Sequence, residues 1–258
     1  YADHRDLHSF PTRRSSDLHS SQNEQDSRNY AIAAKLLMLE PSDSAECRDM
    51  TKLAYTLSEQ FDTPVILRLS TRIAHSRSIV DTMEREDVPL RPYEKNQAKN
   101  IMLPAFARPK HEAVEKRTAA EREWAETCAL NFIEDNGAKT GVIVAGSTYK
   151  YAKEALGDTV NYLKLGVVNP LPVGKIRSFA AGLETVYVIE ELDDIIESHC
   201  KKIGVPVIGK DVFPRCGEFS QKLIAEKLGL PRGGGAAGGG GDPGRPPGMW
   251  GGRPARGG

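Results

Sequence analysis

The sequence has few cysteines and no cysteine-rich motif. No two of its four cysteines form a Cys-x-x-Cys pair. Their spacing therefore indicates neither a zinc knuckle nor a disulfide framework. Unpaired, scattered cysteines fit a reduced compartment best, so we expect the protein to be cytoplasmic. The four residues are Cys47, Cys128, Cys200 and Cys216.

An excess of charge and long apolar runs are also absent. Thirty-five Lys and Arg residues balance 35 Asp and Glu residues, so the formal net charge is +0. This balance offers no electrostatic footprint for nucleic acid or an anionic membrane surface. No apolar run approaches the ~20 residues that a membrane helix needs. We therefore expect no nucleic-acid partner and no membrane association.

Both ends of the sequence lack the apolar periodicity of a folded segment. Residues 8–18, HSFPTRRSSDL, resemble a translated sequencing-library adapter, and we expect residues 1–18 to be non-native. Residues 232–258 are rich in glycine and proline and cannot bury a core. We expect this tail to be disordered and to derive from a corrupted coding sequence. The alternative, an RNA-binding tail, is weakened because Trp250 is its one aromatic residue.

The region 19–80 has the pattern of an α/β unit. The capping-box spacing Ser21-x-x-Glu24 predicts a helix from Ser21 to about Leu36, with a short strand at 38–40. The apolar run 65–70 predicts a strand buried on both faces. A helix between these strands is predicted by apolar residues at helical spacing, namely Met50, Leu53, Ala54, Leu57 and Phe61.

The remainder predicts a linker and a second α/β unit. Residues 81–110 are polar and contain four prolines, which is typical of a linker. A charged helix is expected over 111–136, with Ala125, Cys128, Ala129 and Phe132 on its buried side. Regular alternation of strands and helices then predicts an open parallel sheet within 111–231. We expect strands at 141–147, 162–168, 185–191 and 206–209, and helices at 149–156, 173–181, 195–202 and 218–228.

The strongest candidate binding site is the start of the first predicted helix. Free N–H groups and polar side chains at a helix N-terminus suit an anion or the polar edge of a cofactor. A plain capped helix is the alternative, and the residues alone favour it. The candidate residues are His19, Ser20, Ser21, Gln22 and Asn23.

Two further candidates follow predicted strands. A polar group at the end of strand 65–70 is either a site or a solvated loop, with neither favoured; it comprises Arg68, Thr71, Arg72 and His75. The segment 141–149, GVIVAGSTY, resembles a phosphate loop but lacks Gly-x-Gly-x-x-Gly. The favoured interpretation is that Gly146 relaxes the turn and that Ser147 or Thr148 caps a helix.

An acidic group precedes the helix expected at 195–202. It could form a carboxylate site, but acidic residues are common in the first turn of a helix because they complement its dipole. We favour this second interpretation for Glu190, Glu191, Asp193, Asp194 and Glu197. Nothing near Cys216 predicts an activated thiolate.

The run HSSQNEQDSR at 19–28 is very specific. Together with GVIVAGSTYKYAKEALG and GKDVFPRCGE, it resembles the α subunits of indolepyruvate ferredoxin oxidoreductases, members of the 2-oxoacid:ferredoxin oxidoreductase family. The resemblance covers about 20–230. It implies an α/β fold, with the C-terminal part of a thiamine-diphosphate pyrimidine-binding domain at 19–80. A transketolase C-terminal-like domain with an open parallel sheet would follow at 111–231.

The resemblance also implies an activity. Such enzymes oxidatively decarboxylate aryl-2-oxoacids to aryl-acetyl-CoA, with thiamine diphosphate, Mg²⁺ and [4Fe-4S] clusters as cofactors. Their partners are a β subunit, ferredoxin, CoA and the 2-oxoacid. The glutamate that activates the cofactor, the Mg²⁺-diphosphate motif and the ferredoxin-like cysteines have no counterparts here. We therefore expect an inactive internal fragment. The alternatives are a subunit acting on pyruvate, 2-oxoglutarate or branched-chain oxoacids, and a non-catalytic α/β interaction module.

Overall fold

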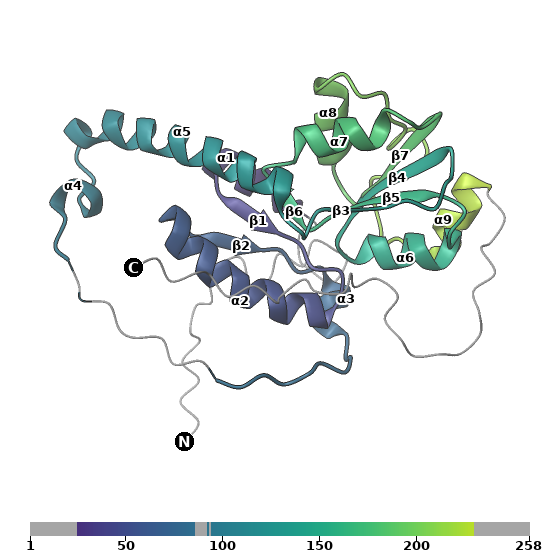
Figure 1. Cartoon of the computed structure of the whole chain (residues 1–258), viewed down its shortest axis with the longest axis horizontal. Helices are drawn as coiled ribbons and strands as arrows, with labels where there is room; N and C mark the ends of the chain where they lie inside the picture. The colour runs from purple at the N-terminus through teal and green to yellow at the C-terminus, as the bar shows by residue number, and fades with distance from the viewer. Residues whose placement is uncertain (1–24, 86–91, 93, 230–258) are drawn as a thin grey trace.

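The computed structural model of the protein describes residues 25–85, 92 and 94–229 (Figure 1). Three predictions fall outside these residues. They concern the adapter-like segment 1–18, the candidate binding residues His19, Ser20, Ser21, Gln22 and Asn23, and the tail 232–258. Within the described part the fold is mixed α/β with two sheets, as the sequence predicted.

The first sheet has three short strands in the order β2-β1-β6. β1 pairs in parallel with β2 and antiparallel with β6. Alternate residues of β1 face opposite sides: Leu37 and Leu39 pack with α2 and α5, whereas Met38 packs with Ala31 and the second sheet. The elements of this region are α1 (Arg28–Ala34), β1 (Leu37–Leu39), α2 (Ser44–Phe61), β2 (Val65–Leu67), α3 (Thr71–His75) and β6 (Val167–Asn169).

Helix α2 forms where its apolar stripe predicts it. Met50 and Leu57 are buried, and Leu53, Ala54 and Phe61 pack against the same core, which confirms the predicted face. The Asp43 side chain caps the helix by accepting a hydrogen bond from the Glu46 amide at 2.8 Å. The Glu46 carboxylate reaches back to the Ser42 amide at 2.8 Å, so both free N–H groups are satisfied.

The second sheet has four strands in the order β3-β5-β4-β7, parallel except for β3. Ile143 and Leu163 face a core that includes Ile176 of α7 and Ile196 of α8. Val142 and Val144 face a core with residues of α6 and α9. The elements are β3 (Phe132–Glu134), β4 (Thr140–Ala145), α6 (Gly146–Leu156), β5 (Asn161–Leu165), α7 (Val173–Ala180), β7 (Thr185–Ile189), α8 (Ile195–Lys202) and α9 (Gln221–Leu228). The strand expected at 206–209 is reduced to an isolated bridge from Ile208 to Tyr187.

The single strand expected over 162–168 was wrong, because the chain changes sheets at Gly166. β5 ends at Leu165 and β6 begins at Val167. A side chain at Gly166 would lie 2.8 Å from the backbone oxygen of Leu130, so only glycine fits this crossing. The Asn131 side chain fixes it by accepting hydrogen bonds from the Gly166 and Val167 amides, both at 3.0 Å.

The long charged helix starts earlier and ends earlier than its pattern suggested. α5 spans Pro104–Thr127, so it begins inside the segment expected to be a linker, which also contains α4 (Gln97–Asn100). Its first residue is a proline, which is tolerated because the first helical N–H has no partner within the helix. The chain then forms β3, and Ala129 is exposed, contrary to prediction. Figure 1 shows α5 running out beyond both sheets.

The first helix also differs from its prediction. Gln25 and Asp26 are not helical, and α1 begins at Arg28 rather than continuing from Ser21. Asp26 was expected to complement the dipole of the first turn. Instead its carboxylate accepts hydrogen bonds from the Arg28 backbone at 3.0 Å and from the Arg28 side chain. The proposed capping box itself lies outside the described residues.

Candidate functional site

The carboxyl ends of strands from both sheets come together in one buried polar cluster. Ligands of open α/β sheets bind at such ends. Glu40 directly follows β1, Arg68 follows β2 and Glu190 follows β7. We call the group the junction cluster; its members are Asp26, Arg28, Glu40, Arg68, Glu190 and Glu191.

Arg28 is the most highly connected residue of the junction cluster. Its side chain is 2% exposed and pairs with Asp26 at 2.6 Å and Glu190 at 2.5 Å. One of its amino groups also donates to the backbone oxygens of Glu191 and Asp193, both at 3.0 Å. Burial disfavours its charge, but the surrounding carboxylates outweigh burial and raise the pKa of Arg28. The guanidinium therefore stays charged and fully paired.

The pKa values of its two carboxylate partners shift in opposite directions. Burial acts to raise the pKa of Asp26, but hydrogen bonds and charge from Arg28 outweigh it, and the pKa lies below its usual value. Burial raises the pKa of Glu190, and the opposing effect of Arg28 and two backbone amides only partly offsets it. The pKa of Glu190 therefore lies above that of Asp26, so Glu190 takes up a proton before Asp26 as the pH falls.

Glu40 lies between Arg68 and the start of α6. The Arg68 guanidinium donates a hydrogen bond to the Glu40 carboxylate. Gly146 has a φ of +55°, and a side chain there would lie 2.3 Å from that carboxylate. An acidic side chain thus occupies the space beside the helix N-terminus that a phosphate would need. The geometry favours the turn interpretation of GVIVAGSTY over a phosphate loop.

Hydroxyl groups complete this edge of the site. The Ser70 and Ser147 side-chain oxygens lie 3.2 Å apart and join the two sheets. Within the described residues, Glu40 Oε2 and Thr71 Oγ1 are buried and have no hydrogen-bond partner. Buried polar atoms of this kind normally bind a water molecule or ligand. The cluster therefore retains unused polar capacity near Glu40 and Thr71.

The polar group predicted after β2 is divided by the structure. Arg68 and Thr71 are buried, whereas Arg72 and His75 are exposed. Arg72 forms an ion pair with Glu218 at 2.9 Å. The later residues form a solvated turn, as one interpretation expected. The first residues belong to the buried polar cluster or lie beside it, and their role in a binding site stays a prediction.

The acidic group before α8 serves mainly as backbone caps. Glu190 accepts hydrogen bonds from the Ile196 and Glu197 amides, and Glu191 accepts one from the Phe219 amide at 2.7 Å. Asp194 pairs with Arg215, and its hydrogen bonds lower its pKa to about 2. In the part of the chain that the structure describes, no group of three His, Cys, Asp or Glu residues could hold a metal. These contacts support the helix-start interpretation.

Two of the described cysteines are buried thiols with a raised pKa. Cys128 and Cys200 are buried, and burial raises the pKa of both, that of Cys200 to about 12. Cys216 is exposed and unbridged. All four cysteines are free in this part of the chain, as their spacing predicted.

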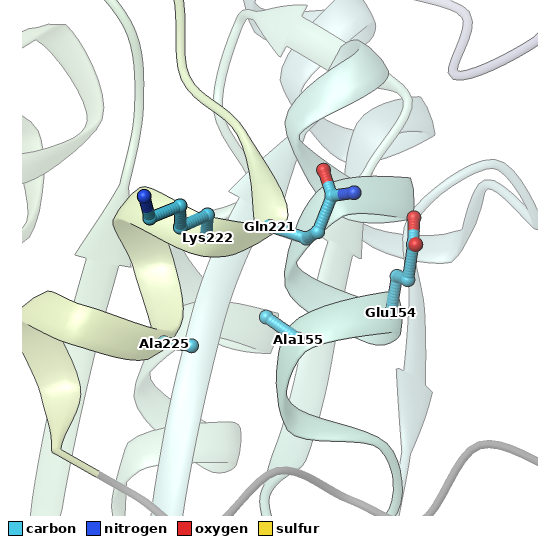
Figure 2. Close-up of a pocket in the computed structure, with 5 residues that line it drawn as sticks. All are labelled: Glu154, Ala155, Gln221, Lys222 and Ala225. Carbon is cyan, nitrogen blue, oxygen red and sulfur yellow. The ribbon is translucent and has the colours of Figure 1, made fainter.

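Pockets lined by described residues border these elements. One, of about 450 Å³, lies between α1 and the turn joining β7 to α8, and its walls include Gln25, Asn29, Tyr30, Asp193 and Arg215. A smaller one, of about 280 Å³, lies between α6 and α9. Figure 2 shows its lining residues: Glu154 and Ala155 on α6, and Gln221, Lys222 and Ala225 on α9. Only the first pocket adjoins the junction cluster, since Asp26 lines it too.

Sequence reasoning missed the pairing of Arg28 with Glu190. The two residues are 162 positions apart, so no local pattern could connect them. The apolar side predicted for this helix was Tyr30, Ala33, Ala34 and Leu37, and it was wrong for the first three, which are exposed. The buried side carries Arg28 and Ala31, three residues apart and therefore on the same face of the helix.

Comparisons with known proteins agree with this architecture. The family model described as "Pyruvate flavodoxin/ferredoxin oxidoreductase, thiamine diP-bdg" matches residues 11–132. The indolepyruvate oxidoreductase subunit IorA of Pyrococcus horikoshii is 38% identical over 226 residues, which cover 81% of this chain and 35% of that protein. The subunit of Thermococcus kodakarensis is 37% identical over 82% of this chain and 36% of its own length. The chain belongs to the 2-oxoacid:ferredoxin oxidoreductase family.

Membership of this family confirms the resemblance inferred from HSSQNEQDSR and the other motifs. The chain spans about a third of the length of the curated relatives it matches. A 2-oxoglutarate:ferredoxin oxidoreductase from Magnetococcus marinus, solved with 2-oxoglutarate, coenzyme A and succinyl-CoA, has the same fold. It is 17% identical, with a TM-score of 0.54 over 82% of this chain and 43% of that one. Among the described residues, no helix is long and apolar enough to cross a bilayer.

Proposed function

We propose that this chain is part of the α subunit of a thiamine-diphosphate-dependent oxidoreductase that acts on aryl-2-oxoacids such as indolepyruvate. The complete enzyme would convert them to aryl-acetyl-CoA and CO2 and pass the electrons to ferredoxin. Its partners would be a β subunit and ferredoxin, and its compartment the cytoplasm. The observation that carries this proposal is the 33–38% identity to six subunits named for indolepyruvate oxidation.

The proposed cofactor site lies at the start of the motif. His19, Ser20, Ser21, Gln22 and Asn23 are the residues that we assign to thiamine diphosphate, which supplies the carbanion chemistry when bound. The pocket beside Gln25 supports this assignment, because about 450 Å³ is an ordinary size for a small-molecule site. The described residues supply its wall: Asp26 and Arg28 hold that wall against the second sheet.

Mg²⁺ and the [4Fe-4S] clusters do not fit the described residues. A [4Fe-4S] cluster needs several cysteine ligands close together, and the described cysteines form no such group. Mg²⁺ needs converging oxygen ligands, whereas each junction carboxylate faces an arginine or backbone amides. We assign both to other parts of the complete enzyme.

We also propose a division of the chain into two domains and a linker. The segment 19–80 would be the partial pyrimidine-binding domain, and 111–231 the transketolase C-terminal-like domain, with 81–110 between them. The substrate has alternatives to indolepyruvate, because pyruvate, 2-oxoglutarate and branched-chain oxoacids undergo the same chemistry. The 2-oxoglutarate enzyme that shares this fold is the specific reason to test that substrate.

A chimera tests the proposal directly. Residues 25–229 would replace the matching segment of the Thermococcus kodakarensis subunit, co-expressed with its own partner, and viologen reduction would be measured with each oxoacid. We expect indolepyruvate-dependent turnover above that of the other oxoacids. A chimera that folds but turns over none of the oxoacids would contradict the enzyme assignment. It would favour the non-catalytic interaction module.

The chain alone provides the matched control. Without the remaining two thirds of its relatives' length, we expect no turnover of indolepyruvate with thiamine diphosphate, CoA and a viologen acceptor. Measurable turnover by the purified chain would contradict its dependence on other regions.

A further inference from the structure

The Arg28 guanidinium ties together two segments that are far apart in the sequence. On one side it binds Asp26, two residues earlier, through both carboxylate oxygens. On the other it donates to Glu190 at 2.5 Å and to the backbone oxygens of Glu191 and Asp193. All three nitrogens of the guanidinium are therefore used, and they bridge α1 to the turn between β7 and α8.

Helix α1 has few other attachments. Only Arg28 and Ala31 are buried among its seven residues, whereas Tyr30 and Ile32 are 57% and 47% exposed. The helix has no side-chain N-cap. A helix this short is unstable without tertiary contacts. Besides Ala31 in the core, Asn29 donates to the Asp193 carboxylate at 2.8 Å, and the Asn169 side chain donates to the Ala31 backbone oxygen at 3.3 Å. Arg28 adds the buried ion pair and two further bonds to the turn, and so contributes strongly to the position of the helix.

The turn between β7 and α8 depends on the same contacts. Leu192 has a φ of +62°, a left-handed conformation that a branched side chain rarely adopts without support. The neighbouring Asp193 is held by three bonds to residues 26–29: its amide donates to Asp26, its backbone oxygen accepts from Arg28, and its carboxylate accepts from Asn29 at 2.8 Å. The start of α1 and the residues just before it thus support the unusual backbone of this turn.

The pocket of about 450 Å³ lies between these two segments. Gln25, Asp26, Asn29 and Tyr30 form one wall, and the other wall consists of Leu192 and Asp193 together with Arg215 and Cys216. We propose that Arg28 is a positioning residue that fixes the two walls of this pocket relative to each other. It forms hydrogen bonds with Asp26 of one wall and Asp193 of the other, and its own side chain is not part of the lining.

The consequence for the cofactor rests on the proposed function. Asn23, the last of the residues assigned to thiamine diphosphate, is three peptide units from Asp26. The two positions are therefore close along the chain. On the proposed function, a shift of Asp26 would be passed through this short connection, and Arg28 would couple cofactor affinity to the turn of the second sheet.

An arginine is required for this role. Its planar fork can satisfy two carboxylates and two backbone oxygens at fixed angles, whereas a lysine ammonium is a single point with three donors. Arg28→Lys keeps the charge and removes the bridge. Asp26→Asn keeps the side-chain size and removes the charge from the α1 side only. Arg177→Lys is the matched control, because Arg177 is exposed and donates to one backbone oxygen, that of Ile203.

The test is local hydrogen exchange measured by mass spectrometry on the purified chain. In R28K we expect at least tenfold faster exchange in both 26–34 and 190–196, with strands β4 and β5 unchanged. D26N should accelerate the same two segments, and R177K neither. Faster exchange in only one segment, or equal acceleration throughout the chain, would contradict the positioning role.

Titration with thiamine diphosphate separates this role from the proposed function. If the chain binds the cofactor, R28K should weaken binding at least tenfold, whereas R177K should not change it. Unchanged affinity in R28K would overturn the coupling to the cofactor. Absence of binding by the wild-type chain would count against the proposed site at His19–Asn23, while the exchange comparison would still decide whether Arg28 positions the two walls.

Discussion

The two sheets of this protein are stabilised in different ways. The second sheet has strands of up to six residues and helices on both faces, so most of its strand residues are buried by apolar neighbours. The first has three strands of three residues each. One of them, β6, comes from the region that otherwise builds the second sheet.

The difference indicates that the first sheet depends on the second. Met38 of β1 packs into the same core as Ile143 and Leu163. β6 pairs with β1 on the side opposite β2, and the junction cluster adds ion pairs between the first helix and the second sheet. Isolated small sheets are marginal in water. We therefore infer that both regions unfold together.

The largest expected effect is the loss of Arg28. In Arg28→Ala the buried carboxylates of Asp26 and Glu190 lose their shared cation. Removing one partner of a buried pair typically costs about 3–5 kcal/mol. We expect a decrease of this size in the free energy of unfolding, measured by urea titration. A decrease below about 1 kcal/mol would show that the regions do not depend on this cluster.

A substitution at Gly146 tests the contact between the start of α6 and Glu40. In Gly146→Ala the new methyl group meets the Glu40 carboxylate at a φ of +55°. Strain and overpacking should lower the free energy of unfolding by about 1–3 kcal/mol. Gly182→Ala is the control, because nothing lies within 4 Å of a side chain there. Equal stability of the two variants would contradict the close approach.

Glu191 predicts a pH dependence of smaller size. Burial raises its pKa, so the folded state binds the proton more tightly than the unfolded state. Its stabilising contribution is present below the ordinary pKa of about 4.5 and is lost as pH rises through the folded-state value. Glu191→Gln should therefore gain stability over the wild type as pH rises from about 4.5 to 7. Thermal unfolding of both proteins across this range checks the sign, and a constant difference would contradict it.

The smallest effect is expected at an exposed pair. Arg72 and Glu218 lie 2.9 Å apart, but the Arg72 side chain is 56% exposed. Exposed pairs contribute about 0–1 kcal/mol because water and salt screen them. Arg72→Ala should change the free energy of unfolding by less than about 0.5 kcal/mol. A decrease in the free energy of unfolding as large as that of Arg28→Ala would contradict the expected difference between the buried and the exposed arginine.

Local patterns in the sequence predicted some elements well and others poorly. The stripe on α2 and the apolar strands β4 and β7 were predictable, because spacing and burial agree there. The break at Gly166 was not, because it depends on the backbone of Leu130 approaching from another element. The early start of α5 was hidden by prolines that usually end helices.

The candidate site was predictable only in part. Arg68 and Thr71 follow a buried strand, which is a recognisable location for polar residues. The roles of Arg28 and Asp26 depend on Glu190 and Asp193, more than 160 residues away. The residues that the sequence ranked first, His19–Asn23, lie outside the described part, so their assignment remains a proposal.

The accessibility of two buried cysteines tests the joint unfolding most directly. Cys128 belongs to the core around the first sheet and Cys200 to the core of the second. In a Cys47→Ser, Cys216→Ser background, thiol labelling would be followed at each cysteine as urea is increased. The account predicts the same midpoint and slope at both, since neither thiol reacts until its core opens. Labelling of Cys128 at clearly lower urea than Cys200 would show that the first sheet opens independently and would contradict the account.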